Sequence, residues 1–200
     1  MRAKKNTSLV TSVILISHAS TPALRRAAFP VDESIDASAR DKAAKLGLAL
    51  RLRRAWTGPE LRTIETARAL ALEPVIELAL RDCDYGRWTG LPLAEVQEAE
   101  PAAIGDWLSD PGAAPHDGES ICAVLARVAH WLNTLLEEPG RFAAVTHPAV
   151  VRAAIIHAIG AHARSFWRID VAPLTVTVLS RCDGRWTLRS SGSPLRGTKI

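Results

Sequence analysis

Two histidines in this sequence stand directly after apolar runs that are typical of buried strands. His18 follows "VILIS", residues 13–17, and His147 follows "FAAVT", residues 142–146. A solvated turn would more often begin with Asn, Asp or Gly, so chain reversal alone does not explain these imidazoles. Each histidine also precedes a turn or a helix start, where free backbone N–H groups and the helix dipole favour an anion. We therefore expect the two imidazoles to act on an anionic group.

An arginine and two carboxylates could complete such a site. Arg62 lies in "TGPELRTIETARAL", residues 57–70, at the start of a helix that also follows a strand. Its guanidinium is suited to forked recognition of phosphate or carboxylate. The loop "LRDCDYGRWTG" brings Asp82 and Asp84 beside Tyr85 and Trp88. Aromatic walls of this kind can desolvate a carboxylate and raise its pKa until it serves as a proton donor, and we expect this here.

Alternating strand and helix patterns surround these residues. Apolar and β-branched runs predict strands, at residues 10–16, 54–57, 141–146, 174–181 and 185–190, with an extended segment at 74–80. Helical spacing predicts helices, at residues 37–51, 59–71, 120–137 and 148–159, with two shorter pieces around Pro101 within 88–115. The alternation predicts an α/β protein with three layers, α/β/α, and a mostly parallel central sheet. Ligands of such sheets bind beyond the carboxyl ends of the strands, where both histidines are expected.

Length and composition are those of a single globular domain. A chain of 200 residues with 48% apolar and 23% charged content fits one domain over residues 1–200, with a compact insertion at about 88–119. The net charge of +4 includes a basic cluster, Arg51, Arg53 and Arg54. We interpret the cluster as a solvated helix end, because it has no interleaved aromatic residues and matches no nucleic-acid module. Nucleic acid is therefore not the expected partner.

The cysteines and the first residues bear on the cellular compartment. Cys83, Cys122 and Cys182 are widely spaced and form no CxxC pair, which argues against a disulfide framework or a zinc site. The first 20 residues resemble a short signal peptide, but cleavage there would remove the first strand, with His18 in it or near it. No apolar run reaches the roughly 18 residues that a membrane span requires. We expect a soluble cytoplasmic protein that does not bind membranes.

Five short motifs, in order from about residue 13 to residue 180, resemble those of the histidine phosphatase superfamily, which includes the cofactor-dependent phosphoglycerate mutases. The family's Arg-His-Gly-x-Thr is similar to "SHAST" at 17–21, and its Ser-Pro-Leu-x-Arg followed by Thr-Ala is similar to "GPELR" with "TA" at 66–67. Its Leu-x-Glu and Gly-x-Trp-x-Gly are similar to "LRD" and "GRWTG" within 80–90. Its Gly-Glu-Ser is found at 118–120, and its Ser-His-Gly is similar to "THP" at 146–148. The resemblance implies a phosphoglycerate mutase-like fold.

The resemblance also implies a role for each matched side chain. His18 would attack phosphorus and carry a phosphohistidine intermediate that water later hydrolyses. Arg62 and His147 would hold the phosphoryl oxygens and counter their charge. Asp82, in the place of the family's Glu, would protonate the leaving alcohol and then activate water, with Asp84 as the alternative because Asp is one methylene shorter than Glu. No metal or other cofactor is implied, since arginine and histidine supply the positive charge.

Within the first motif, two positions depart from the family pattern. Ser17 stands where the family has arginine, and Ala19 stands where it has glycine. Loss of one preorganised donor typically costs about 10²–10³ in rate, so an unaided pocket should be slow. We expect Arg25 or Arg26, farther along the same loop, to restore the charge. Further substrate-binding candidates are found in the first motif and in the loop before "DGES", where a histidine could roof the pocket: Ser17, Ser20, Thr21 and His116.

The sequence favours a phosphatase over the other activities of the fold. A mutase needs additional loops that close over a bisphosphorylated sugar acid, and residues 88–119 offer only a compact insertion. We therefore expect a metal-independent phosphomonoester hydrolase that acts on a small phosphorylated metabolite, as a monomer or homodimer. Small α-ribazole-phosphatase-like and broad-specificity members are nearest in size and motif spacing. The alternative is a catalytically weakened phosphate-binding or regulatory protein on the same fold. A third hypothesis, a basic nucleic-acid binder, predicts an affinity that falls steeply with salt.

Overall fold

A mostly parallel sheet forms the centre of the computed structural model, which describes residues 11–46, 51–135 and 139–195. Six strands of the described chain lie in the order β3-β2-β4-β1-β5-β6. They are β1 (Thr11–Ser17), β2 (Arg54–Thr57), β3 (Val75–Ile76), β4 (Gly140–Thr146), β5 (Thr175–Cys182) and β6 (Arg185–Pro194). Strands β1 to β4 pair in parallel, whereas β5 and β6 run antiparallel to their neighbours. The predicted class of sheet is therefore confirmed.

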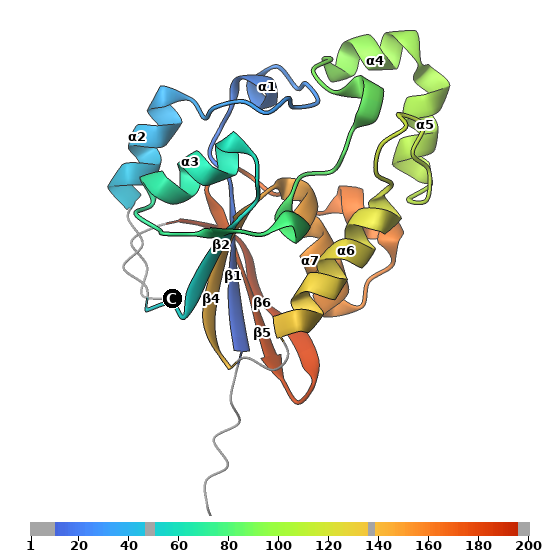
Figure 1. Ribbon diagram of the computed structural model, residues 1–200. Coiled ribbons are helices and arrows are strands. Elements are labelled where there is room, and N and C mark those ends of the chain that lie inside the picture. Colours follow the sequence, from blue (N-terminus) through green and yellow to red (C-terminus); the bar gives the residue numbers. More distant parts are fainter. Residues whose placement is uncertain (1–10, 47–50, 136–138, 196–200) are drawn as a thin grey trace, which may run out of the picture.

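Helices cover both faces of this sheet, as Figure 1 shows. On one face lie α2 (Ala37–Leu46) and α3 (Leu61–Ala69), and on the other lie α6 (Ile121–Thr134) and α7 (Pro148–Ile159). Alternate residues of β1 enter the two cores: Val13 and Leu15 pack with the α6–α7 side, and Ile14 and Ile16 pack with the α2–α3 side. This follows from the strand pleat, which points successive side chains to opposite faces. The three-layer prediction is confirmed.

A third, smaller core lies beyond the carboxyl ends of the parallel strands. It contains Phe29, Trp88 and Trp107, and is enclosed by α4 (Leu93–Ala99) and α5 (Pro101–Ser109). These are the two helical pieces that the sequence predicts on either side of Pro101. The short elements α1 (Pro22–Arg25), η1 (Leu78–Leu80), η2 (Gly86–Trp88) and η4 (Ala163–Arg168) connect this region to the main layers. Figure 1 shows α4 and α5 above the sheet, over the end where α1 lies.

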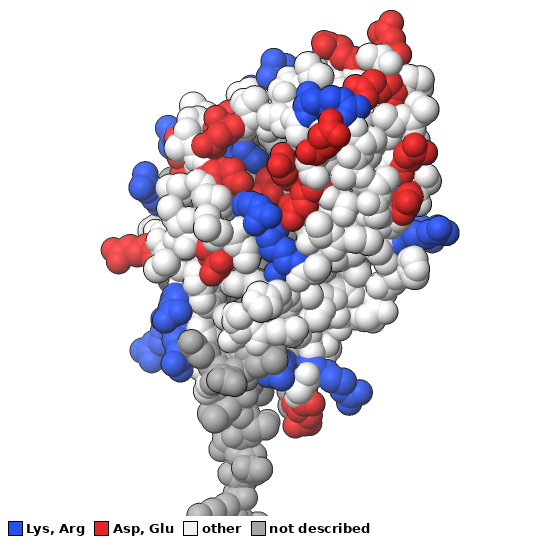
Figure 2. All heavy atoms as spheres, turned by 45° about the vertical axis from the view of Figure 1, so that its right-hand side comes forward, with Lys and Arg blue, Asp and Glu red and all other residues white. Residues whose placement is uncertain are grey.

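The interpretation of the basic cluster as a helix end is wrong. Helix α2 ends at Leu46, and residues 47–50 lie outside the described part of the chain. Arg54 opens β2 instead, because the chain has already become extended before the apolar residues that pair with β4. On the face drawn in Figure 2, Lys and Arg side chains lie in separate groups with acidic side chains between them. No helix in the described ranges is both long and apolar enough to cross a membrane.

Candidate active site

Strands β1 and β4 bring two histidines to the same end of the sheet. Their register pairs Ser17 with Thr146, and the backbone N–H of His18 donates to the Thr146 carbonyl at 2.9 Å. The next residue on each strand is therefore a histidine, and the centroids of the His18 and His147 rings lie 5.3 Å apart. Both residues are buried. Parallel pairing thus joins two imidazoles that are far apart in the sequence.

The His18 imidazole is arranged as a neutral nucleophile. Its Nδ1 lies 2.7 Å from the carbonyl oxygen of Ala19, so this nitrogen carries the proton and donates it there. Burial, and then the nearby His147, lower the pKa of His18 to about 3. The remaining nitrogen, Nε2, keeps its lone pair at neutral pH. A neutral imidazole with a fixed tautomer is what attack on phosphorus requires.

Arg62 is held at the start of α3 with one donor left over. Its two terminal nitrogens donate to the Val31 carbonyl and to Oδ2 of Asp82, each at 2.9 Å. The side chain is almost completely buried, and its Nε has no partner within the described residues. Buried polar atoms in proteins are normally hydrogen-bonded, so this uncommitted donor, on the same guanidinium that contacts Asp82, is a reason to expect a ligand.

His147 lies between two carboxylates. Its Nε2 is 2.7 Å from Oε2 of Glu60, and its Nδ1 is 3.4 Å from Oδ2 of Asp82. Burial tends to raise the pKa of Glu60, but the hydrogen bond and the charge of His147 lower it overall, so Glu60 is an ionised acceptor. Glu60 also accepts the backbone N–H of Asp82 at 2.9 Å. It is a site residue that the sequence reasoning missed, although it stands between a strand end and Arg62 in "GPELR".

Asp82 does not have the raised pKa that the aromatic loop predicts. Burial does act to raise it, but the charges of His147 and Arg62 together lower the pKa of Asp82 below its usual value. The expectation is wrong because it considered the aromatic walls and omitted the cations from β4 and α3. Asp84, the alternative acid, accepts the Gly86 N–H at 2.9 Å as a turn residue and does not line the cavity.

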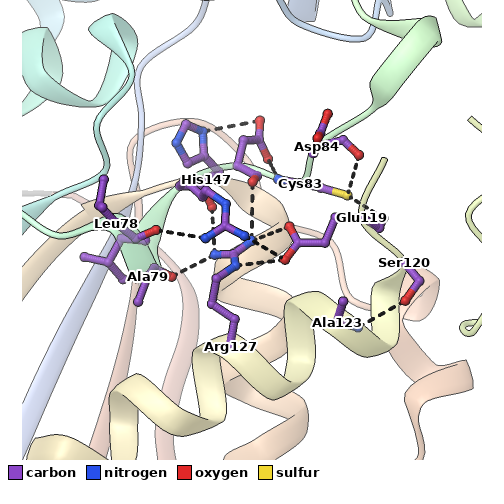
Figure 3. A network of polar contacts seen from close by, with 12 residues as sticks. Leu78, Ala79, Cys83, Asp84, Glu119, Ser120, Ala123, Arg127 and His147 are labelled. Carbon is purple, nitrogen blue, oxygen red and sulfur yellow. Dashed lines mark hydrogen bonds and ion pairs between the residues drawn. The ribbon is translucent and has the colours of Figure 1, made fainter. Parts of the chain in front are cut away.

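The loop that carries Asp82 is fixed from behind by a buried ion pair, shown in Figure 3. Arg127, on α6, reaches the carboxylate of Glu119 with Nε at 2.9 Å and a terminal nitrogen at 2.6 Å. Its other contacts are with backbone carbonyls of the loop, those of Ala79, Arg81 and Asp82. Glu119 belongs to the "GES" motif, so this motif positions the acid loop from outside the cavity.

A cavity of about 530 Å³ opens beside His18 and Asp82. Its walls are mostly apolar and aromatic, and include Leu24, Phe29, Leu93, Trp107, Leu108 and Trp167. Arg152 of α7 also faces it, a residue that the sequence analysis did not single out. Arg62 and His147 are not among the lining residues. The Asp82 carboxylate, which does line the cavity, lies in contact with both of them.

Of the residues predicted to bind the substrate, Thr21 lines the cavity and the others do not. Thr21 lines it, while its Oγ1 caps α1 by accepting the Leu24 N–H. Arg25 pairs with Asp36 and is 60% exposed at its side chain. The structure places several candidates away from the cavity: Ser17, Ser20, Arg25, Arg26 and His116.

Two of these outcomes have clear physical reasons. His116 is completely buried behind the aromatic cluster, with its ring 4.9 Å from that of Trp88, so it does not roof the pocket. Arg25 has its own carboxylate partner on the surface, so it does not replace the missing arginine charge. Ser17 is buried, and its Oγ has no partner within the described residues.

A family profile matches almost the whole described chain. The profile of the histidine phosphatase superfamily (branch 1) covers residues 13–193. The chain belongs to this superfamily. The five motifs on which the family resemblance rests lie within these residues. In the described ranges of this family member, no group of three or more His, Cys, Asp or Glu could hold a metal ion.

The curated relatives of this chain are longer than the segment in which they match it. A bifunctional protein of Mycobacterium tuberculosis is 32% identical over 117 residues, which are 56% of this chain and 32% of that protein. Phosphoserine phosphatase 1 of Hydrogenobacter thermophilus is 28% identical over 117 residues, which are 54% of this chain and 52% of that protein. The matched segment thus spans from about a third to about half of their length.

Solved structures share the fold over nearly the full chain. A putative α-ribazole-5′-P phosphatase from Escherichia coli has a TM-score of 0.83 at 21% identity, covering 94% of this chain and 99% of that one. A mycobacterial glucosyl-3-phosphoglycerate phosphatase has a TM-score of 0.82 at 22% identity, covering 91% and 98%. At these identities the comparison shows that the phosphoglycerate mutase-like fold is the same.

Proposed function

We propose that this member of the histidine phosphatase superfamily is a metal-independent phosphomonoester hydrolase whose nucleophile is Nε2 of His18. The observation that carries the proposal is the fixed tautomer of His18, with Nδ1 bound to the Ala19 carbonyl and the ring on the wall of a cavity. The adjoining Arg62 and His147 supply donors for a tetrahedral anion. Family membership supports the same chemistry.

The reaction proceeds in two steps at phosphorus. Nε2 of His18 forms a bond to phosphorus as the bond to the ester oxygen breaks, and the leaving alkoxide takes a proton from Asp82. Water then attacks the phosphohistidine and gives a proton back to the Asp82 carboxylate, releasing inorganic phosphate and restoring His18. Arg62 and His147 stabilise the charge on the phosphoryl oxygens during both transfers.

Asp82 has to exchange partners before it serves as the acid. In the structure Asp82 is an ionised carboxylate, 2.9 Å from the Arg62 guanidinium and 3.4 Å from His147. A bound phosphate dianion takes over these two cationic partners and places negative charge beside Asp82. Loss of opposite charge and gain of like charge both raise the pKa of a carboxylate. Substrate binding therefore raises the pKa of Asp82, so that the carboxylate takes up a proton from solvent and can then donate it to the leaving group.

The alternative function is a phosphate-binding or regulatory protein with little turnover. Two observations favour it: Ser17 supplies no guanidinium at the family's arginine position, and Asp82 competes with phosphate for Arg62. Under either function we propose a small phosphorylated metabolite as the ligand. We also propose a cytoplasmic location, since Cys83 and Cys122 are free thiols.

Hydrolysis of p-nitrophenyl phosphate tests the proposal. Wild type should release p-nitrophenol, and a denaturing quench at alkaline pH during turnover should trap phosphate on the protein in an acid-labile, base-stable bond. His18→Ala should lose both signals, whereas His130→Ala, a change at an exposed histidine of α6, should keep them. Turnover that persists in His18→Ala refutes the nucleophile. Vanadate binding by wild type without turnover supports the alternative function.

A further inference from the structure

The cavity beside His18 is too apolar for a small, highly charged leaving group. Apart from the catalytic side chains, its walls come largely from α1, α4, α5 and the segment around η4, and contribute mainly aliphatic and aromatic groups. Its volume of about 530 Å³ lies in the range of about 300–1,000 Å³ that is typical of sites for drug-sized molecules. A small polar alcohol would leave most of these walls in contact with water.

Three leucines at the rim strengthen this point. Leu24, Leu93 and Leu108 line the cavity while remaining between 38% and 49% exposed. They come from three different helices, α1, α4 and α5, and converge on one opening. Contiguous exposed apolar surface on a soluble protein generally marks a place where something binds.

One cationic group interrupts the apolar wall. Arg152 lies on α7, and its Nε donates to the Ile169 carbonyl at 2.8 Å. Its guanidinium carbon is 5.6 Å from the centroid of the Phe166 ring and 5.7 Å from that of Trp167. These contacts fix the plane of the guanidinium, while its two terminal nitrogens have no hydrogen-bond partner within the described residues. The head group is thus oriented, and most of its donors are unused.

The surroundings of Arg152 favour the binding of an anion. Burial lowers the pKa of Arg152, although the nearby Tyr85, Asp170 and Asp82 act to raise it. The guanidinium therefore lacks part of its usual solvation. Asp170 also lines the cavity but is exposed and forms no hydrogen bond to Arg152. Guanidinium and carboxylate pair through two parallel hydrogen bonds, which the unused terminal nitrogens of Arg152 can donate.

We propose that the substrate is the phosphate ester of a bulky aromatic alcohol that carries a carboxylate, with its ring on the apolar walls and its carboxylate on Arg152. The inference rests on the proposed phosphatase function, because it identifies the alcohol that leaves when the same site cleaves the phosphate ester. The phosphate lies at His18 and Arg62, the ring lies against the walls that include Leu93 and Leu108, and the second anion lies at Arg152.

A panel of primary-alcohol esters separates the three elements of this proposal: 4-carboxybenzyl phosphate, benzyl phosphate and O-phosphoserine. All three break a bond to a primary alkoxide, which limits differences in intrinsic reactivity. Burial of a ring should raise kcat/KM for benzyl phosphate about 10- to 100-fold above that for O-phosphoserine. The carboxylate should add about tenfold more through a charge-assisted hydrogen bond to Arg152.

Paired variants assign these preferences to named side chains. Arg152→Gln should abolish the advantage of 4-carboxybenzyl over benzyl phosphate, whereas Arg164→Gln, at an exposed arginine of η4, should leave it unchanged. Asp170→Asn should increase the same advantage, because it removes a competing carboxylate. Leu108→Gln should reduce the advantage of benzyl phosphate over O-phosphoserine, whereas Ile159→Gln, at an exposed position outside the cavity, should not.

The outcomes distinguish failure of this inference from failure of the proposed function. If none of the three esters is hydrolysed, and p-nitrophenyl phosphate is not either, the proposed function fails and the inference with it. If O-phosphoserine is hydrolysed as efficiently as the aromatic esters, the phosphatase stands and the aromatic substrate class is refuted. If the aromatic preference holds but Arg152→Gln leaves the carboxylate advantage intact, the assignment of Arg152 is refuted.

Discussion

Two regions of the molecule use buried arginines in opposite ways. Behind the acid loop, all three nitrogens of the Arg127 guanidinium are bound, to Glu119 and to backbone carbonyls. Beside the cavity, Nε of Arg62 has no partner in the described chain, and Arg152 commits only its Nε. A guanidinium whose donors are all satisfied within the protein stabilises a structure, whereas one with unused donors at a cavity is available to a ligand. The first region should therefore determine stability and the second should determine activity.

The largest effect on stability is expected from Arg127→Met. Removing Arg127 leaves the buried Glu119 carboxylate with only Arg81, a largely exposed partner at 3.3 Å, and breaking a buried ion pair typically costs about 3–5 kcal/mol of unfolding free energy. Urea unfolding measures the loss. Arg68→Met, at an exposed arginine of α3, is the matched control and should change stability by less than about 0.5 kcal/mol. An equal loss of unfolding free energy in the two variants would show that the Arg127 network does not stabilise the fold.

Among variants that keep the His18 nucleophile, the largest effect on activity is expected from Arg62→Lys. Lysine keeps the charge but cannot donate a fork of parallel hydrogen bonds to a phosphoryl group. We expect kcat/KM for p-nitrophenyl phosphate to fall about 10²–10³-fold. The free energy of unfolding should fall much less than in Arg127→Met. If stability collapsed while the folded fraction kept its activity, Arg62 would belong with Arg127 as a structural residue.

A smaller effect, on the pH dependence of stability, is expected at His18. Its pKa of about 3 in the folded protein lies below the ordinary 6.5, so the unfolded chain binds a proton in this interval that the native state does not. Stability therefore rises with pH across the window and is lost as pH falls from 6.5 toward 3. Between pH 7 and pH 5, wild type should lose about 2 kcal/mol more than His18→Asn.

Urea unfolding of the two proteins at both pH values gives this difference directly. The other histidines are present in both, so their contributions cancel to first order. Parallel pH profiles for wild type and His18→Asn would mean that the imidazole is not buried as a neutral group. The same low pKa predicts that kcat/KM shows no acid limb near pH 6.5 from His18.

The smallest effect is expected at Gly58, where the two regions meet. A Cβ at this position would lie 2.8 Å from the Leu80 carbonyl oxygen, 2.9 Å from Oε2 of Glu60 and 3.1 Å from Nε2 of His147. Gly58→Ala should displace His147 and lower kcat/KM about tenfold. Gly105→Ala is the control, because within the described chain nothing beyond its sequence neighbours and its own helix backbone lies within 4 Å of the added methyl group. An unchanged kcat/KM in Gly58→Ala would show that the Glu60–His147 contact tolerates movement.

The sequence predicted most elements because their signals are local. Strand 54–57 and helix 148–159 have the bounds expected from apolar runs, Pro148 and Gly160. Helix 59–71 is shorter than expected, since Pro59 and Glu60 precede its first turn. Residues 136 and 137, the last two of the expected helix 120–137, lie outside the described chain.

The site was only partly predictable for a different reason. His18, Arg62, Asp82 and His147 do lie together, as the motif resemblance implies. Glu60 and Arg152 were missed, because nothing near them in the sequence shows that one meets His147 and the other faces a cavity. Arg25 was proposed for its closeness along the chain, and its ion pair with Asp36 shows that closeness along the chain does not ensure closeness to the site.

The sequence by itself determined the alternation of strands and helices, the placement of histidines after two strands, and the family to which the chain belongs. Only the tertiary structure decided which donors are committed and which are available. The reason is that hydrogen bonding and charge depend on long-range partners: Arg62 meets Asp82 across 20 residues of chain, and His147 meets Glu60 across 87. The charges of His147 and Arg62 lower the pKa of Asp82, and the Asp82 carboxylate occupies Arg62 until a bound anion replaces it.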